Sequence, residues 1–321
     1  MKLKRFNIAK LEKIALCAAL VAMGGVLIAF PQRYLSVCFN GLCLWAECVL
    51  PSLFPFMIIT LLLINLGAPQ ALSKRFTRAT RKLKLPAAAP PLFLMSVCSG
   101  YPAGSKILSE YYGRGLVSAS DAKKLAPLLS TCGPLFALGT VGGKAFGGGG
   151  AGVKLLCACL ISVLLTSLGY ALICKGGDAP RPASLKTSGD NILYSCFYGG
   201  VTACLVAGGF ICFFYTLSQI IADFNVFKPL EYLLSLPFGG LARGVCLGIC
   251  EATGGCFALA AEGGFFALPL AGFLITFGGA SILCQQLGYL QKCGVNAGFF
   301  IAFKFIQGVL CFGLLCLFSL F

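Results

Sequence analysis

The sequence predicts an all-α polytopic membrane protein in which two inverted repeats, each with a re-entrant hairpin and a discontinuous helix, follow one extra N-terminal span. Three observations support this fold class. Of the 321 residues, 58% are hydrophobic and 11% are charged, whereas soluble domains carry about 25% charged residues. Apolar runs long enough to cross a bilayer recur along the chain. Gly and Pro interrupt some of these runs at corresponding positions of the two halves, which is typical of secondary transporters.

The N-terminal region, residues 1–41, is predicted to hold a basic segment and the first span. Five of the first 13 residues are Lys or Arg, and residues 14–30 form an apolar run. A signal peptide is the alternative interpretation, but no small-x-small cleavage site precedes Pro31. We therefore expect a retained span with a cytoplasmic N-terminus, which leaves residues 31–41 outside.

The next expected span, residues 42–66, returns the chain to the cytoplasm and is predicted to be kinked by Pro51 and Pro55. Residues 74–84 follow as a loop with six cations, which the positive-inside rule places in the cytoplasm. This loop is expected to attract anionic lipid headgroups. Apart from Phe76 it lacks the interleaved aromatic residues of a nucleic-acid-binding surface, so no nucleic-acid partner is expected.

Repeat 1, residues 42–175, contains two interruptions. Residues 86–113 are too interrupted by Gly and Pro for an ordinary span, so we predict a hairpin that enters and leaves on the cytoplasmic side. A second interruption at 131–134 breaks the following span, and Ser118 is a suitable N-cap for the helix before it. The remaining segments are a polar patch (114–124), the broken span (125–141), a glycine-rich outer loop (142–152) and a closing span (153–174).

Repeat 2, residues 191–321, is predicted to follow a cytoplasmic linker at 176–190 in the opposite orientation, because the odd first span inverts it. Its interruptions lie at 251–255 and 276–281. The expected segments are an outward span (192–221), an outer connection (223–232) and a hairpin entered from outside (237–261). An inward broken span (265–290) and a last span (295–321) follow. The C-terminus is therefore predicted to lie outside.

Interrupted helices place half-helix ends at membrane depth, where their partial charges favour ions and polar groups. Nearby hydroxyl and amide side chains would add ligands for a small polar solute or a coupling ion. The alternative is that each such group only satisfies its own broken backbone. The predicted binding residues are Ser99, Tyr101, Ser105, Lys106, Thr131, Glu251, Thr253, Ser281, Gln285 and Lys304, with Thr276 and Gln286 as further candidates of the same kind.

Three of these residues are ionisable groups in apolar surroundings. A charge near the bilayer centre costs about 2.5–3.5 kcal/mol on insertion scales, so each is expected to have a partner or a water-lined site. Glu251 could pair with Lys106 or Lys304, or take up a proton or Na⁺. The alternative for Lys304 is that it extends to the inner interface. Gln307, three residues further on, would share its helix face.

Enzymatic and metal chemistry are not expected. The chain has no histidine, no G-x-S-x-G motif and no acidic pair in two spans. A Ser–Lys dyad of Ser99 or Ser105 with Lys106 is the remaining catalytic alternative, although adjacent helical side chains diverge. None of the nineteen cysteines forms a C-x-x-C pair, so no metal or other cofactor is predicted, and the cysteines are interpreted as small packing residues. A Cys38–Cys43 disulfide is left open.

Several of these motifs resemble YlbJ-type sporulation integral membrane proteins. This family is grouped with the nucleoside-recognition or Gate domain proteins, which are related to concentrative nucleoside transporters and spore maturation proteins. The resemblance covers residue 42 to the C-terminus and is carried by 99–106, 114–118, 131–136, 251–255 and 277–281. The family commonly has a Ser-Pro step at the second interruption, where this chain has Gly133-Pro134. That difference argues against a hydroxyl role there.

The resemblance implies an endospore-forming bacterium and a role in spore cortex formation, and it supplies no solute. We therefore expect a multi-pass cell-membrane protein of the transporter type that acts in sporulation and moves an unidentified small polar solute or ion. Its two halves would rock around the hairpin tips. The alternative is a non-transporting membrane scaffold for spore envelope assembly, since a fold does not fix a function. The oligomeric state is left open.

Overall fold

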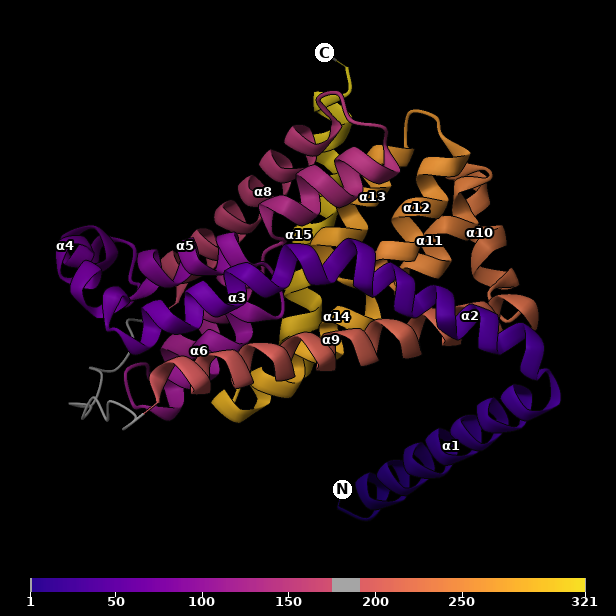
Figure 1. Cartoon of the computed structure of the whole chain (residues 1–321), viewed down its shortest axis with the longest axis horizontal. Coiled ribbons are helices and arrows are strands. Elements are labelled where there is room, and N and C mark those ends of the chain that lie inside the picture. Colours follow the sequence, from indigo (N-terminus) through magenta and orange to yellow (C-terminus); the bar gives the residue numbers. More distant parts are fainter. Residues whose placement is uncertain (1, 175–190, 321) are drawn as a thin grey trace.

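The computed structural model describes residues 2–174 and 191–320, with side chains from residue 10 onward except residue 12. Every regular element in these ranges is a helix (Figure 1). Five of the described helical stretches are long and apolar enough to span a membrane: Pro31–Asn65, Ala151–Ile173, Ile192–Asp223, Ala267–Cys293 and Ala297–Phe318. The chain is therefore an all-α polytopic membrane protein, as predicted. The predicted linker at 176–190 lies outside the described residues.

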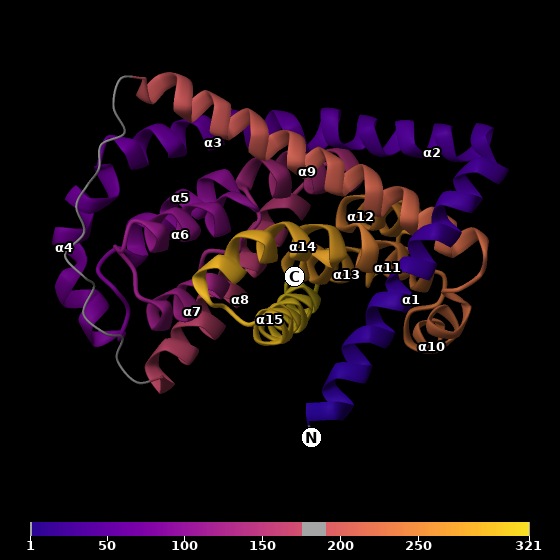
Figure 2. The ribbon, with the colours of Figure 1, turned by 90° about the horizontal axis from the view of Figure 1, so that it is seen from below.

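The first long stretch differs from the prediction. Helix α1 (Lys2–Ala29) angles away from the other helices in Figures 1 and 2. Helix α2 (Pro31–Leu44), the π-helical turn η1 (Trp45–Val49) and α3 (Leu50–Asn65) then run without a gap. The predicted outer segment at 31–41 is thus helical and continuous with the following span, and Pro31 occupies the first turn of this helix, where a missing N–H costs nothing. At 1.5 Å per residue the stretch is about 50 Å long, which exceeds a bilayer core of about 30 Å.

The predicted cationic loop is also wrong for most of its length. Residues 68–82 form helix α4 (Ala68–Lys82), which lies beside α3 and α5 at one end of the molecule (Figure 2). Pro69 starts its first turn, and Leu72 and Phe76 are one helical turn apart, which gives the segment an apolar side. The six cations of this segment are all exposed: Lys74, Arg75, Arg78, Arg81, Lys82 and Lys84.

The remaining helices occur in the same order in both halves of the chain. Two short helices are followed by an interrupted helix and a long helix. In the first half these are α5 (Ala89–Ser99), α6 (Ala103–Gly113), α7 (Ala119–Leu128) with the π-helical η2 (Phe136–Ala145), and α8 (Ala151–Ile173). In the second half they are α11 (Leu241–Cys250), α12 (Ala252–Glu262), α13 (Ala267–Phe277) with α14 (Gly279–Leu290), and α15 (Ala297–Phe318).

A long helix and a short amphipathic helix precede each of these sets. In the first half they are α2–α3 and α4, and in the second half α9 (Ile192–Asp223) and α10 (Lys228–Phe238). The 3₁₀ turn η3 (Gln291–Cys293) connects α14 to α15. Helix α7 begins as predicted, because Ser118 Oγ accepts a hydrogen bond from Asp121 N at 3.1 Å. Both predicted interruptions are found, at residues 129–135 (break 1) and at Gly278 (break 2).

The proline-rich part of the first long helix obtains its missing hydrogen bonds from η2. Pro51 has no N–H, so it leaves the carbonyl of Glu47 without its helical donor. Lys144 Nζ donates to this carbonyl at 2.9 Å. Thr140 Oγ1 donates to the neighbouring Cys48 carbonyl, also at 2.9 Å. The interruption of one helix is thereby tied to the interrupted helix beside it.

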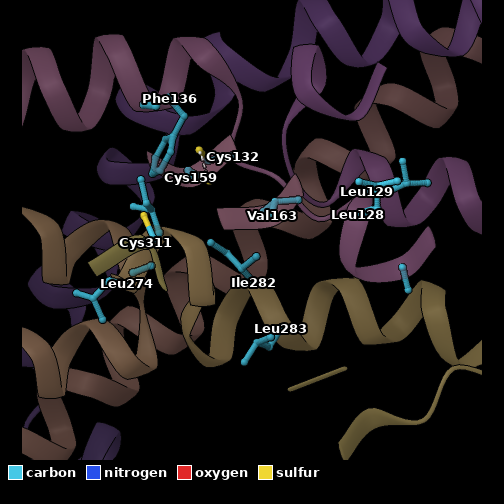
Figure 3. Packing of buried hydrophobic residues seen from close by; sticks show 14 of the residues in the cluster. Leu128, Leu129, Cys132, Phe136, Cys159, Val163, Leu274, Ile282, Leu283 and Cys311 are labelled. Carbon is cyan, nitrogen blue, oxygen red and sulfur yellow. Dashed lines mark hydrogen bonds between the residues drawn. The ribbon is translucent and has the colours of Figure 1, made fainter. Parts of the chain in front are cut away.

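One hydrophobic cluster extends through both halves. Helix α15 packs against α8 of the first half and α13 of the second, and α14 packs against α6. Figure 3 shows buried side chains of this cluster from α7, α8, α13, α14 and α15, including Leu128, Val163, Leu274 and Ile282. Because these helices contribute to one core, the two halves are interlocked and do not form separate domains.

Candidate functional site

Each pair of short helices places its turn against the break of its own half. A Cβ at Gly100, between α5 and α6, would lie 2.7 Å from the backbone nitrogen of Gly133 in break 1. A Cβ at Gly279, beside break 2, would lie 2.6 Å from the carbonyl oxygen of Gly248 in α11. Both Gly100 and Gly279 also have positive φ, at +69° and +58°. Glycine is therefore required at both close approaches.

A small cavity lies between these interruptions. Its volume is about 30 Å³, which is enough for one or two water molecules. The walls come from both helix pairs, from both interrupted helices and from η1, α3 and α9, and they are mostly apolar. The polar side chains on the cavity are Ser52, Ser99, Tyr101, Glu251, Thr253 and Gln285.

Glu251 is the one carboxylate on this cavity. It separates α11 from α12, is 1% exposed, and caps α12 with its own side chain. Oε1 accepts from Thr253 N at 3.0 Å, and Oε2 accepts from Gly254 N at 2.6 Å. These hydrogen bonds and the positive end of the α12 dipole stabilise a negative charge at this buried position.

Two polar groups of the first helix pair reach other elements from the cavity wall. Tyr101 OH donates to the carbonyl of Ile275, near the C-terminal end of α13, at 2.7 Å. Ser99 Oγ lies 2.6 Å from Thr60 Oγ1 and donates to the Phe56 carbonyl of α3 at 3.2 Å. The turn between α5 and α6 is therefore bonded to both halves of the chain.

The amides and hydroxyls of α14 form a second polar layer. Gln285, on the cavity, donates from Nε2 to Ser281 Oγ at 3.2 Å, and Ser281 lies outside the cavity lining. Gln286 accepts from Ser105 Oγ at 3.1 Å through Oε1, which joins α14 to α6. Ser105 and Ser281 are thus bonded to amide side chains and not to the broken backbone that the alternative interpretation assigned to them.

The two predicted membrane lysines do not contact Glu251. Lys106 Nζ donates to the Gly199 carbonyl in α9 at 2.6 Å, and Lys304 Nζ donates to the Ser130 carbonyl in break 1 at 2.9 Å. Over residues with described side chains, the ion pairs found are Arg33–Asp223 and Lys124–Asp121. Lys304 is 1% exposed, so the interpretation that it extends to the interface is wrong.

Of the ten predicted binding residues, the structure places Ser99, Tyr101, Glu251, Thr253 and Gln285 on the cavity. Of the other five, Ser105, Lys106, Thr131 and Lys304 contact neighbouring elements, with Thr131 Oγ1 lying 3.3 Å from Ser96 Oγ. Ser281 is bonded to Gln285 of its own helix. Ser52 on α3 was missed, although its position directly after Pro51 in an apolar span is a signal that could have identified it. All nineteen cysteines are free, and Cys38 Sγ lies 3.2 Å from Cys212 Sγ rather than beside Cys43.

These features define a class: a polytopic α-helical membrane protein with a partly polar cavity between interrupted helices. The chain is 25% identical, over an alignment of 335 residues, to the sporulation integral membrane protein YlbJ of Bacillus subtilis (strain 168). The alignment covers 94% of this chain and 82% of the relative. This similarity confirms the YlbJ-type resemblance. No family model matches the chain, and no solved structure matches it.

Proposed function

We propose that this chain is a transporter-like membrane protein that acts in sporulation and moves a small polar solute or ion across the cell membrane. The observation that carries the proposal is the cavity on which both helix pairs and both interrupted helices meet, with the buried carboxylate of Glu251 on its wall. Convergent polar groups in a mostly apolar cavity are typical of small-molecule sites. The sporulation context comes from the similarity to YlbJ.

The topology proposed for this activity is an inverted repeat with re-entrant hairpins. The helix order of α2–α8 recurs in α9–α15, and the pairs α5–α6 and α11–α12 are each too short to cross a bilayer helix by helix. The N-terminus would lie in the cytoplasm and the C-terminus outside. Alternating access would then open the cavity to one side at a time by rocking one half against the other.

A non-transporting scaffold for spore envelope assembly is the second candidate. The small volume of the cavity favours it, because about 30 Å³ admits water and excludes any organic solute unless the helices move. A scaffold would keep this cavity closed in every state. A transporter must enlarge it.

The test is ligand-dependent stabilisation of the purified protein, followed by uptake into liposomes. The panel contains nucleosides, amino acids, peptidoglycan precursors, Na⁺ and metal ions. We expect one class to raise the melting temperature and to be transported. Glu251→Gln should abolish both effects, whereas Glu262→Gln, at the exposed far end of the same helix, should change neither. No response across the panel, with normal sporulation of a Glu251→Gln strain, would exclude transport and favour the scaffold.

We also propose that α4 binds anionic lipid headgroups. Its cations are exposed, and the segment from Ala68 to Leu85 contains no Asp or Glu. Lys84 Nζ donates to the Leu172 carbonyl at the end of α8, and Lys124 Nζ donates to the Lys84 carbonyl, so the helix is held at the ends of neighbouring spans. A fixed basic helix beside membrane spans is suited to an acidic lipid surface.

A further inference from the structure

Where α7 ends and break 1 begins, the carbonyls of Pro127, Leu129 and Ser130 each accept a hydrogen bond from a side chain. The last carbonyls of any helix have no partner within the helix, and they bear its partial negative charge. At membrane depth water cannot satisfy them, so protein groups or a bound cation must. In interrupted transporter helices such ends coordinate Na⁺ or take part in proton binding.

Here side chains of the protein itself donate to these three carbonyls. Gln307 Nε2 donates to the Pro127 carbonyl at 3.2 Å. Ser96 Oγ donates to the Leu129 carbonyl at 2.5 Å. The third donor is charged: Lys304 Nζ binds the Ser130 carbonyl at 2.9 Å. An ammonium group therefore lies at the negative end of the half-helix.

The ammonium group of Lys304 has no carboxylate partner among the side chains that the structure describes. Its one hydrogen bond there is to Ser130, although an ammonium has three donors. Ser130 Oγ and Gln307 Oε1 are buried beside this end without hydrogen-bond partners. The described hydrogen bond of the Lys304 ammonium is thus to a carbonyl oxygen of break 1, the kind of ligand that binds Na⁺ at interrupted helices.

Break 2 lacks an equivalent cation. The Ile275 carbonyl near the end of α13 receives its hydrogen bond from the neutral phenol of Tyr101. The buried charge in that half is the carboxylate of Glu251 at the start of α12. The two interruptions therefore differ in charge: break 1 already contains a positive group, and the second half contains a negative group.

We propose that Lys304 is a tethered cation that occupies the position at break 1 where a monovalent metal ion would otherwise bind. Break 1 then takes up no Na⁺ or K⁺, and any cation that the protein binds must use the Glu251 side of the cavity. The proposal goes beyond the proposed function, and it holds for a transporter and for a scaffold alike. Its test needs no substrate.

The test compares Lys304→Ala with Lys304→Met in purified protein. The alanine variant leaves space beside the Ser130 carbonyl, whereas methionine fills that space with an apolar chain. Melting temperatures are measured in NaCl, KCl, ethylammonium chloride and choline chloride at equal ionic strength. We expect Lys304→Ala to melt several degrees below wild type in choline and to recover in a saturable manner with Na⁺ or ethylammonium. Lys304→Met should stay low in all four salts.

Lys106→Ala is the matched control. It also removes a lysine that binds a buried carbonyl, but Gly199 lies within α9 and not at a helix end. We expect no cation-dependent recovery in this variant. Equal responses of Lys304→Ala and Lys304→Met to every cation would overturn the proposal.

If Lys304→Ala does not fold, a Na⁺ titration of the wild-type protein and of Glu251→Gln decides the question. A saturable stabilisation by Na⁺ that persists in Glu251→Gln would place an ion outside the Glu251 side and overturn the proposal. Stabilisation that is absent in both proteins, or lost in Glu251→Gln, would support it.

Discussion

Two tyrosines of the first helix pair, the partly buried Tyr101 and the buried Tyr111, differ in whether their hydroxyl groups have partners. Tyr101 OH donates to the Ile275 carbonyl, whereas Tyr111, at 1% exposure, has a buried hydroxyl group without a partner. Removing one partner of a buried hydrogen bond leaves the other unsatisfied, which costs about 1–3 kcal/mol. Removing an unpartnered hydroxyl carries no such cost.

We therefore expect Tyr101→Phe to lower the free energy of unfolding by about 1–3 kcal/mol, because the Ile275 carbonyl loses its donor. Tyr111→Phe is the matched control and should be neutral or stabilising. Thermal denaturation of the two variants in the same detergent checks this. Equal destabilisation of both would show that ring packing, and not the hydrogen bond, accounts for the role of Tyr101.

At this scale the sequence indicated which residues are unusual but not which groups they contact. Glu251 and Lys304 were recognised because a charge in an apolar run needs a partner. Their partners are backbone N–H groups and a backbone carbonyl, which every residue carries, so no sequence pattern could identify them. Pairing of Glu251 with a lysine was a reasonable chemical expectation that the packing of α9 and α15 does not permit.

Among the elements, α4 carries a group of exposed cations that can be replaced without touching the core. Its exposed cations project from a helix that is anchored by buried Pro69 and Thr80. Each cation near an anionic surface contributes about 1 kcal/mol of attraction, and salt screens it. Neutralising the cations should therefore change lipid binding without disturbing the core.

We predict that replacing Lys74, Arg75 and Arg78 with Gln removes most of the stabilisation that phosphatidylglycerol gives over phosphatidylcholine. The readout is the melting temperature of detergent-solubilised protein with each lipid added, at low and high salt. The control replaces three exposed cations outside α4, Lys123, Lys228 and Lys292, and should keep the lipid effect. Glycerol phosphate serves as a further arm, and stabilisation by it equal to that by the lipid would contradict binding of a membrane surface.

Element boundaries were predictable where Gly and Pro interrupt apolar sequence, as at Gly100, Gly133 and Gly278, because these residues prevent regular helix. Helix α4 was not predicted, because its cations were interpreted only as the sign of a cytoplasmic loop, although Leu72 and Phe76 have helical spacing. The start of α2 was missed because Pro31 was interpreted as the end of a span and not as the first turn of the next helix.

At the scale of the whole molecule, α2 of the first half packs against α9 of the second half. Two close side-chain contacts join these helices. Arg33 binds Asp223 through Nε at 2.7 Å and Nη2 at 2.5 Å, and Tyr34 OH donates to the same carboxylate at 3.0 Å. Further along, Cys38 and Cys212 bring their sulfur atoms within 3.2 Å. A rocking motion of the halves must change this crossing or carry both helices together.

We expect a thiol oxidant such as diamide to join Cys38 and Cys212, with loss of two protons and two electrons from the two thiols. If α2 and α9 move against each other during transport, the crosslinked protein should lose uptake and regain it on reduction. Peptide mass mapping identifies the bond, and Cys38→Ser should abolish both the crosslink and the inhibition. Full uptake by quantitatively crosslinked protein would contradict relative motion at this crossing.

If the chain is a transporter, the hydrogen bond from Tyr101 to Ile275 would couple the first helix pair to the interrupted helix of the second half. If the first helix pair withdraws to admit a solute, the end of α13 in the opposite half loses its donor inside the bilayer. A conformation open to both faces at once would therefore leave at least one more buried carbonyl orphaned, at a cost of about 1–3 kcal/mol. In a transporter this single phenol would therefore oppose separation of the first helix pair from α13.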